Sequence, residues 1–212
     1  MKTKIRIAAW LLTAFALWTL LICFVDVQPI GPKGSSVGFA TVNRWVHTLT
    51  GVHMGLYTLT DWLGLVPIAV GIGFGLMGLF QWLKRKSLKK VDFSILMLGG
   101  FYVAVIVSFL FFETIVVNFR PVLIAGVLEA SYPSSTTMLA MCVMPTAAMQ
   151  AHDRIRNPIW KRCATIGLQV FTAFMVIGRL LSGVHWLTDI VGGALLSAGL
   201  VMAYVGVCDL RK

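Results

Sequence analysis

The sequence predicts an all-α membrane protein: a polytopic bundle of six membrane-spanning helices with both termini in the cytoplasm. Only 12% of the 212 residues are charged and 58% are hydrophobic, whereas roughly 25% of the residues of a soluble domain are charged. The surface of a soluble domain needs more polar side chains than this chain has, and a disordered chain has fewer apolar residues. The apolar residues form six runs, and the basic residues lie between these runs. Together these observations leave only the integral membrane class.

Each of the six runs is long enough for a helix that crosses a hydrocarbon core of about 30 Å. Backbone groups inside lipid must form their hydrogen bonds within the segment, which favours helices. The first run follows basic residues as a signal peptide does, but it is longer than a signal sequence and has no clear cleavage site after it, so we expect it to be retained. The expected spans are residues 5–25, 63–83, 93–117, 134–151, 163–181 and 186–207 of a single domain, 1–212.

The distribution of the basic residues predicts the orientation of the chain. Fourteen of the 18 Lys and Arg residues lie at the two termini and in the second and fourth connections. The positive-inside rule therefore places these segments in the cytoplasm of a plasma (inner) membrane. Only Lys33, Arg44, Arg120 and Arg179 lie on the outer side. The net charge of +10 thus reflects topology and contact with anionic headgroups, and we expect no nucleic-acid partner.

The first outer connection, residues 26–62, is too long for a plain turn. Its apolar residues Phe39, Val42, Trp45, Val46 and Leu49 recur at helical spacing. This pattern predicts a helix that lies on the membrane surface. Such a helix either covers the bundle or gates access to a substrate.

Polar residues that could take part in catalysis or binding lie near the outer ends of the predicted spans. Ionisable residues inside membrane spans are costly and therefore mark functional sites, and the candidates are Glu113, Arg179 and Asp189. The same outer layer contains Arg120-Pro121, the run Pro133-Ser134-Ser135-Thr136, and His185. The polar groups of several segments therefore converge on one face of the membrane.

The types and spacing of these residues predict a phosphate site. His185 and Asp189 are separated by four positions and share one face of a helix. A carboxylate beside an imidazole fixes its tautomer and activates it as a base or nucleophile. Arginine side chains match phosphate oxygens, and serine hydroxyls and backbone amides at a helix start complete an anion site.

The order of these residues resembles the type 2 phosphatidic acid phosphatases, a family of membrane lipid phosphatases with six helices. That family reads Lys-x6-Arg-Pro, then Pro-Ser-Gly-His, then Ser-Arg-x5-His-x3-Asp. The third motif is present here from Arg179 through His185 to Asp189, with Gly178 in place of the leading serine. The first motif retains Arg120-Pro121, and the second reads Pro133-Ser134-Ser135-Thr136. The resemblance covers about residues 60–207.

The resemblance implies roles for individual residues. His185 would be the nucleophile that accepts a phosphoryl group, and Asp189 would orient it. The phosphoryl oxygens would be held by Arg120, Arg179, Ser134 and the neighbouring residues Ser135 and Thr136. Water would then hydrolyse the phosphohistidine, without a metal or other cofactor. The substrate would be a membrane lipid phosphate or diphosphate, reached from the side of the membrane outside the cytoplasm.

The second motif departs from the family pattern at Thr136. The family has a histidine there that protonates the leaving group, and a general acid is typically worth about 10²–10⁴-fold in rate. Its loss matters least when the leaving group is a phosphate, whose second pKa is about 6. A lipid diphosphate such as a polyprenyl diphosphate is therefore the favoured substrate over phosphatidic acid. Alternatively, His47 or His53 of the outer connection replaces the acid.

The first motif departs at Glu113, which stands in the lysine position. Its carboxylate would repel a phosphate if it faced the site, unless it pairs with Arg120 or turns away. Two alternative functions follow. One is a catalytically degenerate relative that binds or moves a phosphorylated lipid, and the other is a phosphotransferase that uses the same site. The sequence makes no prediction of the oligomeric state.

Overall fold

The computed structural model describes residues 2–209, so Arg211 and Lys212, counted above among the basic residues, lie outside the described part. Within that part the chain is all-α, and its extended pairings are limited to three isolated β-bridges. The helices are α1 (Lys2–Phe24), α2 (Ala40–Thr50), α3 (Met54–Leu63), α4 (Leu65–Arg85), α5 (Phe93–Thr114), α6 (Ser135–Arg154), α7 (Pro158–Leu181) and α8 (Leu187–Cys208). Short 3-10 turns, η1 (Pro32–Gly34) and η2 (Leu88–Lys90), precede α2 and α5.

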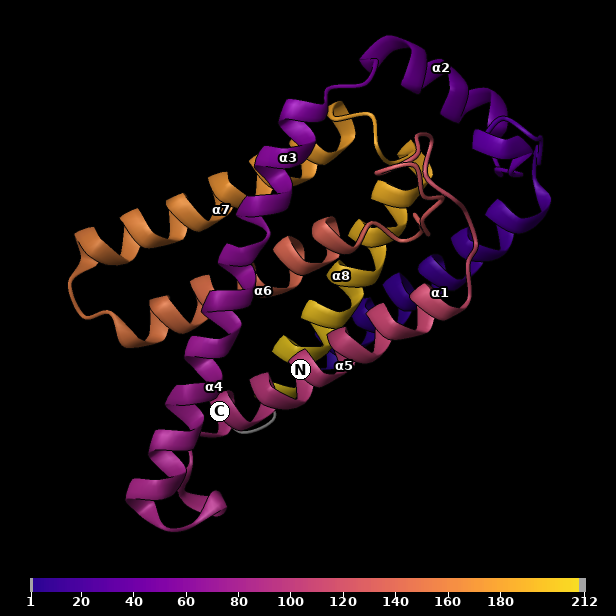
Figure 1. Cartoon of the computed structure of the whole chain (residues 1–212). Helices are drawn as coiled ribbons and strands as arrows, with labels where there is room; N and C mark the ends of the chain where they lie inside the picture. Colours follow the sequence, from indigo (N-terminus) through magenta and orange to yellow (C-terminus); the bar gives the residue numbers. More distant parts are fainter. Residues whose placement is uncertain (1, 210–212) are drawn as a thin grey trace.

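Five helical segments among the described residues are long and apolar enough to cross a membrane: Lys2–Phe24, Met54–Arg85, Phe93–Thr114, Pro158–Leu181 and Leu187–Cys208. The second of these joins α3 and α4. The fourth predicted span corresponds to α6, which has 20 residues but is less apolar, and ten of its residues are buried. It packs against α7 and α8 instead of facing lipid (Figure 1). The all-α class is confirmed, and the six-span bundle with cytoplasmic termini stays a prediction.

Apolar side chains form both a buried core and an outward face. The core lies between α5, α6 and α8 and includes Leu98, Cys142 and Leu196. Large apolar side chains such as Trp10 of α1 and Val170 of α7 are more than half exposed on the outside of the bundle. A contiguous apolar surface of this kind is unfavourable in water and is expected where helices contact lipid.

Glycines allow α1 to lie directly on α8. A Cβ atom at Gly199 would come within 2.7 Å of the Leu12 side chain, and one at Gly206 within 2.8 Å of the Ile5 side chain. Small residues at such contacts let helix backbones approach closely, which is how helices in membranes gain van der Waals contact. This pair of glycines therefore fixes α8, and with it the residues at its N-terminus, against α1.

The two ends of the bundle differ in character (Figure 1). At one end Asp92 ties together the ends of α4, α5 and α6, because its carboxylate lies 2.9 Å from Arg85 and 3.1 Å from Arg154. At the same end Lys4 of α1 lies 2.6 Å from Asp209. The opposite end carries α2, the loop 115–134 and the turn between α7 and α8. The predicted site residues lie at this second end, away from most of the basic residues.

The predicted surface helix of the first outer connection is present as α2. Its apolar residues Val42, Trp45 and Leu49 are exposed, whereas Asn43 is fully buried. The Asn43 amide contacts Thr188 at the start of α8. The face of α2 that carries Asn43 and His47 is therefore turned toward the bundle, whereas Val42, Trp45 and Leu49 are turned outward.

Candidate active site

A tight turn between α7 and α8 places His185 at the end of the bundle. Gly183 has φ +68°, and a Cβ atom there would lie 1.9 Å from the carbonyl oxygen of Gly51. Only glycine fits a left-handed position with so close a neighbour. The amide of His53 also donates to the Ser182 carbonyl at 2.9 Å. The connection from α2 to α3 therefore packs on the turn and holds its shape.

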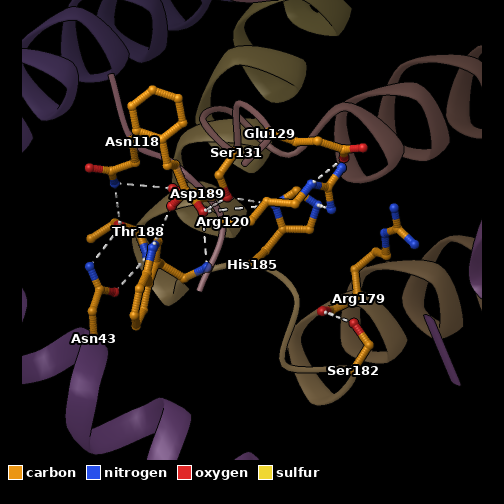
Figure 2. Close-up of polar contacts among 12 residues, drawn as sticks. Asn43, Asn118, Arg120, Glu129, Ser131, Arg179, Ser182, His185, Thr188 and Asp189 are labelled. Carbon is orange, nitrogen blue, oxygen red and sulfur yellow. Dashed lines mark hydrogen bonds and ion pairs between the residues drawn. The ribbon is translucent and has the colours of Figure 1, made fainter. Parts of the chain in front are cut away.

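His185 and Asp189 lie close together, but His185 precedes the first residue of α8 by two positions, so the prediction that the two share one face of a helix is wrong. Both side chains are buried, and His185 Nδ1 lies 3.8 Å from Asp189 Oδ2. The Ser131 hydroxyl lies between them: its Oγ is 3.1 Å from Nδ1 and donates a short hydrogen bond to Oδ2 (Figure 2). The imidazole and the carboxylate are therefore connected through a third residue.

The Asp189 carboxylate receives further hydrogen bonds that fix its position. The backbone amide of Trp186 donates to Oδ2 at 2.9 Å, which caps the first turn of α8. The side-chain amide of Asn118 donates to Oδ1 at 3.2 Å. Buried carboxylates are stable only with such partners. Asp189 is thus an acceptor held by three residues from two segments of the chain.

Arg120 lies on the other side of the imidazole. Its Nη1 is 3.2 Å from His185 Nε2, and its Nε is 3.0 Å from a carboxylate oxygen of Glu129. Both of its contacts are visible in Figure 2, where the guanidinium lies between the imidazole and Glu129. A permanent positive charge therefore faces Nε2 of the histidine that the resemblance identifies as the nucleophile.

Arg179 is buried nearby, but its guanidinium contacts α3 instead of the imidazole (Figure 2). It donates to the Tyr57 carbonyl at 3.3 Å and to Asp61 at 3.4 Å, and it lies over the Tyr57 ring. Its Nε is buried without a hydrogen-bond partner. The two arginines of the predicted phosphate site therefore lie in the same region with different partners.

The environment of His185 keeps its imidazole neutral. Burial lowers the pKa of His185 to about 4, and the positive charges of Arg120 and Arg179 act in the same direction, against the Asp189 carboxylate. A neutral imidazole has a free lone pair on one nitrogen. His185 can therefore act as a nucleophile at neutral pH.

The start of α6 lies beside this cluster. The Ser134 amide donates to the Asp189 carbonyl at 3.1 Å, and the Ser134 hydroxyl is buried without a partner. The Thr137 hydroxyl is likewise buried and unpartnered. Unsatisfied donors at a helix N-terminus favour an anion, because the backbone amides and the helix dipole attract negative charge. This geometry fits the predicted phosphate-binding role of the segment.

Two hollows meet at Ser135. A pocket of about 10 Å³, with room for about one water molecule, is lined by Glu113, Ser131, Ser135 and His185 among others. A groove of about 670 Å³ begins at Asp61, Ser135 and Thr136 and continues along apolar residues of α4, α5 and α6. Thr136 therefore lines the groove, whereas Glu113 lines the small pocket beside the imidazole.

The structure also places the residues whose roles the sequence left open. Arg120 pairs with Glu129, and no ion pair joins it to Glu113 among residues 2–209. His47 Nε2 lies 3.1 Å from the Gly183 carbonyl oxygen, so this side chain packs on the turn before His185. His53 contacts the Thr50 carbonyl oxygen within its own connection.

Sequence reasoning missed Ser131, Asn118 and Glu129. All three lie in the loop 115–134, where no helical periodicity predicts which side chains meet. Ser131 precedes the second motif by two positions, which is the only signal that could have drawn attention to it. Within the described part of the chain, no three His, Cys, Asp or Glu side chains gather as they would at a metal site.

Comparisons with known proteins found one family match and one similar fold. Residues 113–210 match the model of the PAP2 superfamily. The fold is similar to the crystal structure of the first transmembrane PAP2 type phosphatidylglycerolphosphate phosphatase from Bacillus subtilis, with a TM-score of 0.59 and 18% identity over 97% of each chain. No curated protein matches the sequence. The resemblance to the type 2 phosphatidic acid phosphatases is therefore confirmed, and the chain is a multi-pass membrane protein.

Proposed function

We propose that this chain, whose residues 113–210 match the model of the PAP2 superfamily, is a phosphatase that hydrolyses a lipid phosphate or diphosphate through a phosphohistidine on His185. The observation that carries the proposal is the contact between Arg120 Nη1 and His185 Nε2 at 3.2 Å, on an imidazole whose other nitrogen is connected to Asp189. This arrangement places a neutral nucleophile beside a cation that can bind phosphate.

In the first step, His185 Nε2 attacks the terminal phosphorus of the substrate. The new N–P bond forms as the P–O bond to the leaving group breaks, and the leaving oxygen takes the electron pair. Arg120 donates to the phosphoryl oxygens in place of Nε2, together with Ser134, Ser135, Thr136 and the α6 amides. Arg179 adds its positive charge from the α3 side. Donors that are fixed before the reaction stabilise the charge that develops in the transition state.

In the second step, water attacks the phosphorus of the phosphohistidine. The N–P bond breaks, its electron pair returns to Nε2, and the proton that the water loses goes to solvent or to the departing phosphate. The phosphorylated imidazole is positively charged until this point. The Asp189 carboxylate stabilises that charge from the side of Nδ1.

The substrate follows from the leaving group that this site can release. Thr136 has no ionisable group to protonate an alkoxide, so a leaving phosphate is favoured, as in a polyprenyl diphosphate. Attack on the terminal phosphorus would release a lipid monophosphate and leave the phosphoryl group on His185. The apolar groove that begins at Ser135 and Thr136 supports a lipid tail that extends between α4 and α5.

The basic residues support the orientation of the site. Lys84, Arg85, Arg154 and Lys4 lie at the end of the bundle opposite His185, and the positive-inside rule assigns that end to the cytoplasm. The proposed site therefore opens outside the cytoplasm, at the outer leaflet of a plasma (inner) membrane. Residues 1–212 act as one membrane-embedded domain in this proposal.

Phosphate release by the purified protein tests the proposal directly. Polyprenyl diphosphate, phosphatidic acid and phosphatidylglycerolphosphate are supplied in parallel, the last because the similar structure is a phosphatase for it. We expect the fastest release from the diphosphate and none from His185→Ala. A clear preference for phosphatidic acid would contradict the substrate assignment. Binding of the lipids without phosphate release would favour a degenerate relative, and transfer of the phosphoryl group to an added lipid alcohol would favour a phosphotransferase.

A further inference from the structure

We infer that the Ser131 hydroxyl is a positioning group for His185: it carries the hydrogen bond between the imidazole Nδ1 and the Asp189 carboxylate, and it thereby keeps Nε2 unprotonated and facing Arg120. The effect on catalysis rests on the proposed function. The tautomer itself is a property of the protein without substrate, so it is tested separately.

The distances exclude a direct hydrogen bond between the imidazole and the carboxylate. His185 Nδ1 and Asp189 Oδ2 are 3.8 Å apart, which is beyond the range of about 2.7–3.2 Å for an N–H···O hydrogen bond. Ser131 Oγ lies 3.1 Å from Nδ1 and also bonds to Oδ2. The hydroxyl therefore occupies the position through which the two groups interact.

The chemistry of the four groups allows one arrangement of protons. A guanidinium only donates, so His185 Nε2 must accept from Arg120 at 3.2 Å. The neutral ring then carries its proton on Nδ1, and this N–H donates to Ser131 Oγ. The Ser131 hydroxyl has a single proton, which it donates to Asp189. In this series of hydrogen bonds, which runs from Arg120 through His185 and Ser131 to Asp189, each proton has one donor and one acceptor.

Burial makes the role of Ser131 hard to replace. Ser131 and His185 are each 3% exposed, and Asp189 is fully buried. Removal of the hydroxyl would leave the Nδ1 proton without an acceptor and would remove one of the donors to Oδ2. The remaining donors to Asp189, from Trp186 and Asn118, do not reach the imidazole. The tautomer preference of His185 would then rest on Arg120 alone.

Removal of the Ser131 hydroxyl should lower turnover more than it weakens substrate binding. The N-phosphorylated ring retains its Nδ1 proton and positive charge, and the same hydroxyl transmits the stabilisation by Asp189. Partners that orient metal-ligating histidines typically contribute about 10–100-fold to activity, and we take the same order of magnitude for this one. We therefore expect Ser131→Ala to lower kcat by this factor with little change in KM, and Ser131→Thr, which keeps a hydroxyl, to recover most of the activity.

The tautomer is measured by ¹⁵N NMR of histidine-labelled protein in detergent, at neutral pH and without substrate. The chain has four histidines, and the His185 signals are those that are missing from His185→Ala. We expect a protonated Nδ1 and an unprotonated Nε2 in the wild type and in Ser131→Thr, and a mixture of tautomers in Ser131→Ala. Ser197→Ala is the matched control, because Ser197 is a buried serine of α8 whose hydroxyl donates to backbone carbonyls away from the site.

Each outcome decides one part of the inference. A protonated Nε2 in the wild type would overturn it without the need for any variant, as would an unchanged tautomer in folded Ser131→Ala. If Ser131→Ala does not fold, the wild type and Ser131→Thr still test the assignment. If the wild type shows the expected tautomer but releases no phosphate from any lipid, the proposed function fails and the positioning role of Ser131 stands.

Discussion

Asn43 of α2 and Thr188 of α8 are joined by two hydrogen bonds. Asn43 Nδ2 donates to Thr188 Oγ1 at 3.0 Å, and the Thr188 amide donates to Asn43 Oδ1 at 3.2 Å (Figure 2). Asn43 also donates to the Gly38 carbonyl. α2 is thereby attached to Thr188 in the first turn of α8, next to Asp189.

Loss of this connection should destabilise the site end of the protein. Because Asn43 is fully buried, Asn43→Ala leaves buried donors and acceptors without partners, which costs about 1–3 kcal/mol. We expect a lower free energy of unfolding in detergent, with an accompanying loss of activity. Thr48→Ala is the control, because Thr48 is exposed on α2 and bonds only within that helix. Equal stability of the two variants would show that α2 is not held through Asn43.

The buried imidazole should make stability depend on pH. The folded-state pKa of His185 is lowered to about 4 from an ordinary value of 6.5, so between these pH values the unfolded chain binds more protons than the folded one. The stabilisation is therefore complete above about pH 6.5 and is lost as the pH falls toward 4, by at most about 1.4 kcal/mol per pH unit. Arg120 and Arg179 contribute by repelling a proton from the ring, and Asp189 opposes them.

Unfolding of the wild type and of His185→Asn at pH 7, 6, 5 and 4 checks this dependence. The variant should lose less stability than the wild type over the interval, because asparagine does not titrate. Parallel curves for the two proteins would contradict a depressed His185 pKa.

Glu129 should compete with phosphate for Arg120. Its half-exposed carboxylate lies 3.0 Å from the Arg120 Nε, and this Nε has no other hydrogen-bond partner. Exposed ion pairs are typically worth about 0.2–1 kcal/mol, so Glu129→Gln should bind inorganic phosphate about 1.4–5-fold more tightly. The inhibition constant of inorganic phosphate in the phosphate-release assay measures this effect. The control Asp153→Asn removes an exposed carboxylate at the basic end and should leave the constant unchanged. Weaker inhibition of Glu129→Gln would mean that Glu129 positions Arg120 for phosphate.

Thr136→His should shift the substrate preference. Thr136 lines the groove next to Ser135, and a histidine there supplies the acid that the second motif of the family has. We expect hydrolysis of phosphatidic acid to rise by at least about tenfold, within the range for general acid catalysis, while diphosphate hydrolysis changes little. Thr165→His, at a half-buried threonine of α7, controls for an added histidine. If Thr136→His changed the hydrolysis of both substrates equally, the substrate preference would not depend on protonation of the leaving group.

The apolar runs predicted the long helices to within a few residues, because lipid imposes the same length and composition on each segment. The first run, for example, was expected over residues 5–25 and forms α1, Lys2–Phe24. α6 is the exception in composition: it is surrounded by other helices, so its surface does not need to be apolar. The polar residues at the start of α6 could be recognised as candidate site residues because a helix that faces lipid would have apolar residues there.

The site was predictable only where its residues are close in the sequence. Asp189 lies in the first turn of α8 and His185 lies two residues before that helix, so their short separation in the sequence predicted their proximity but not its geometry. Ser131, which connects them, is 54 residues away from His185 in the chain and belongs to an irregular loop. The pairing of Arg120 with Glu129, instead of Glu113, likewise depends on the path of that loop. Hydrophobic patterns do not encode such paths, so these contacts required the structure.

The phosphohistidine itself is the most direct test of the account. Purified protein is mixed with polyprenyl diphosphate that carries a radioactive terminal phosphate, the reaction is stopped within the first turnover, and the labelled peptide is sequenced by mass spectrometry. The account predicts a phosphoryl group on His185, present in the wild type, lost in His185→Ala and accumulated less in Ser131→Ala. Full turnover with no label on His185, or with label on another residue, would contradict it.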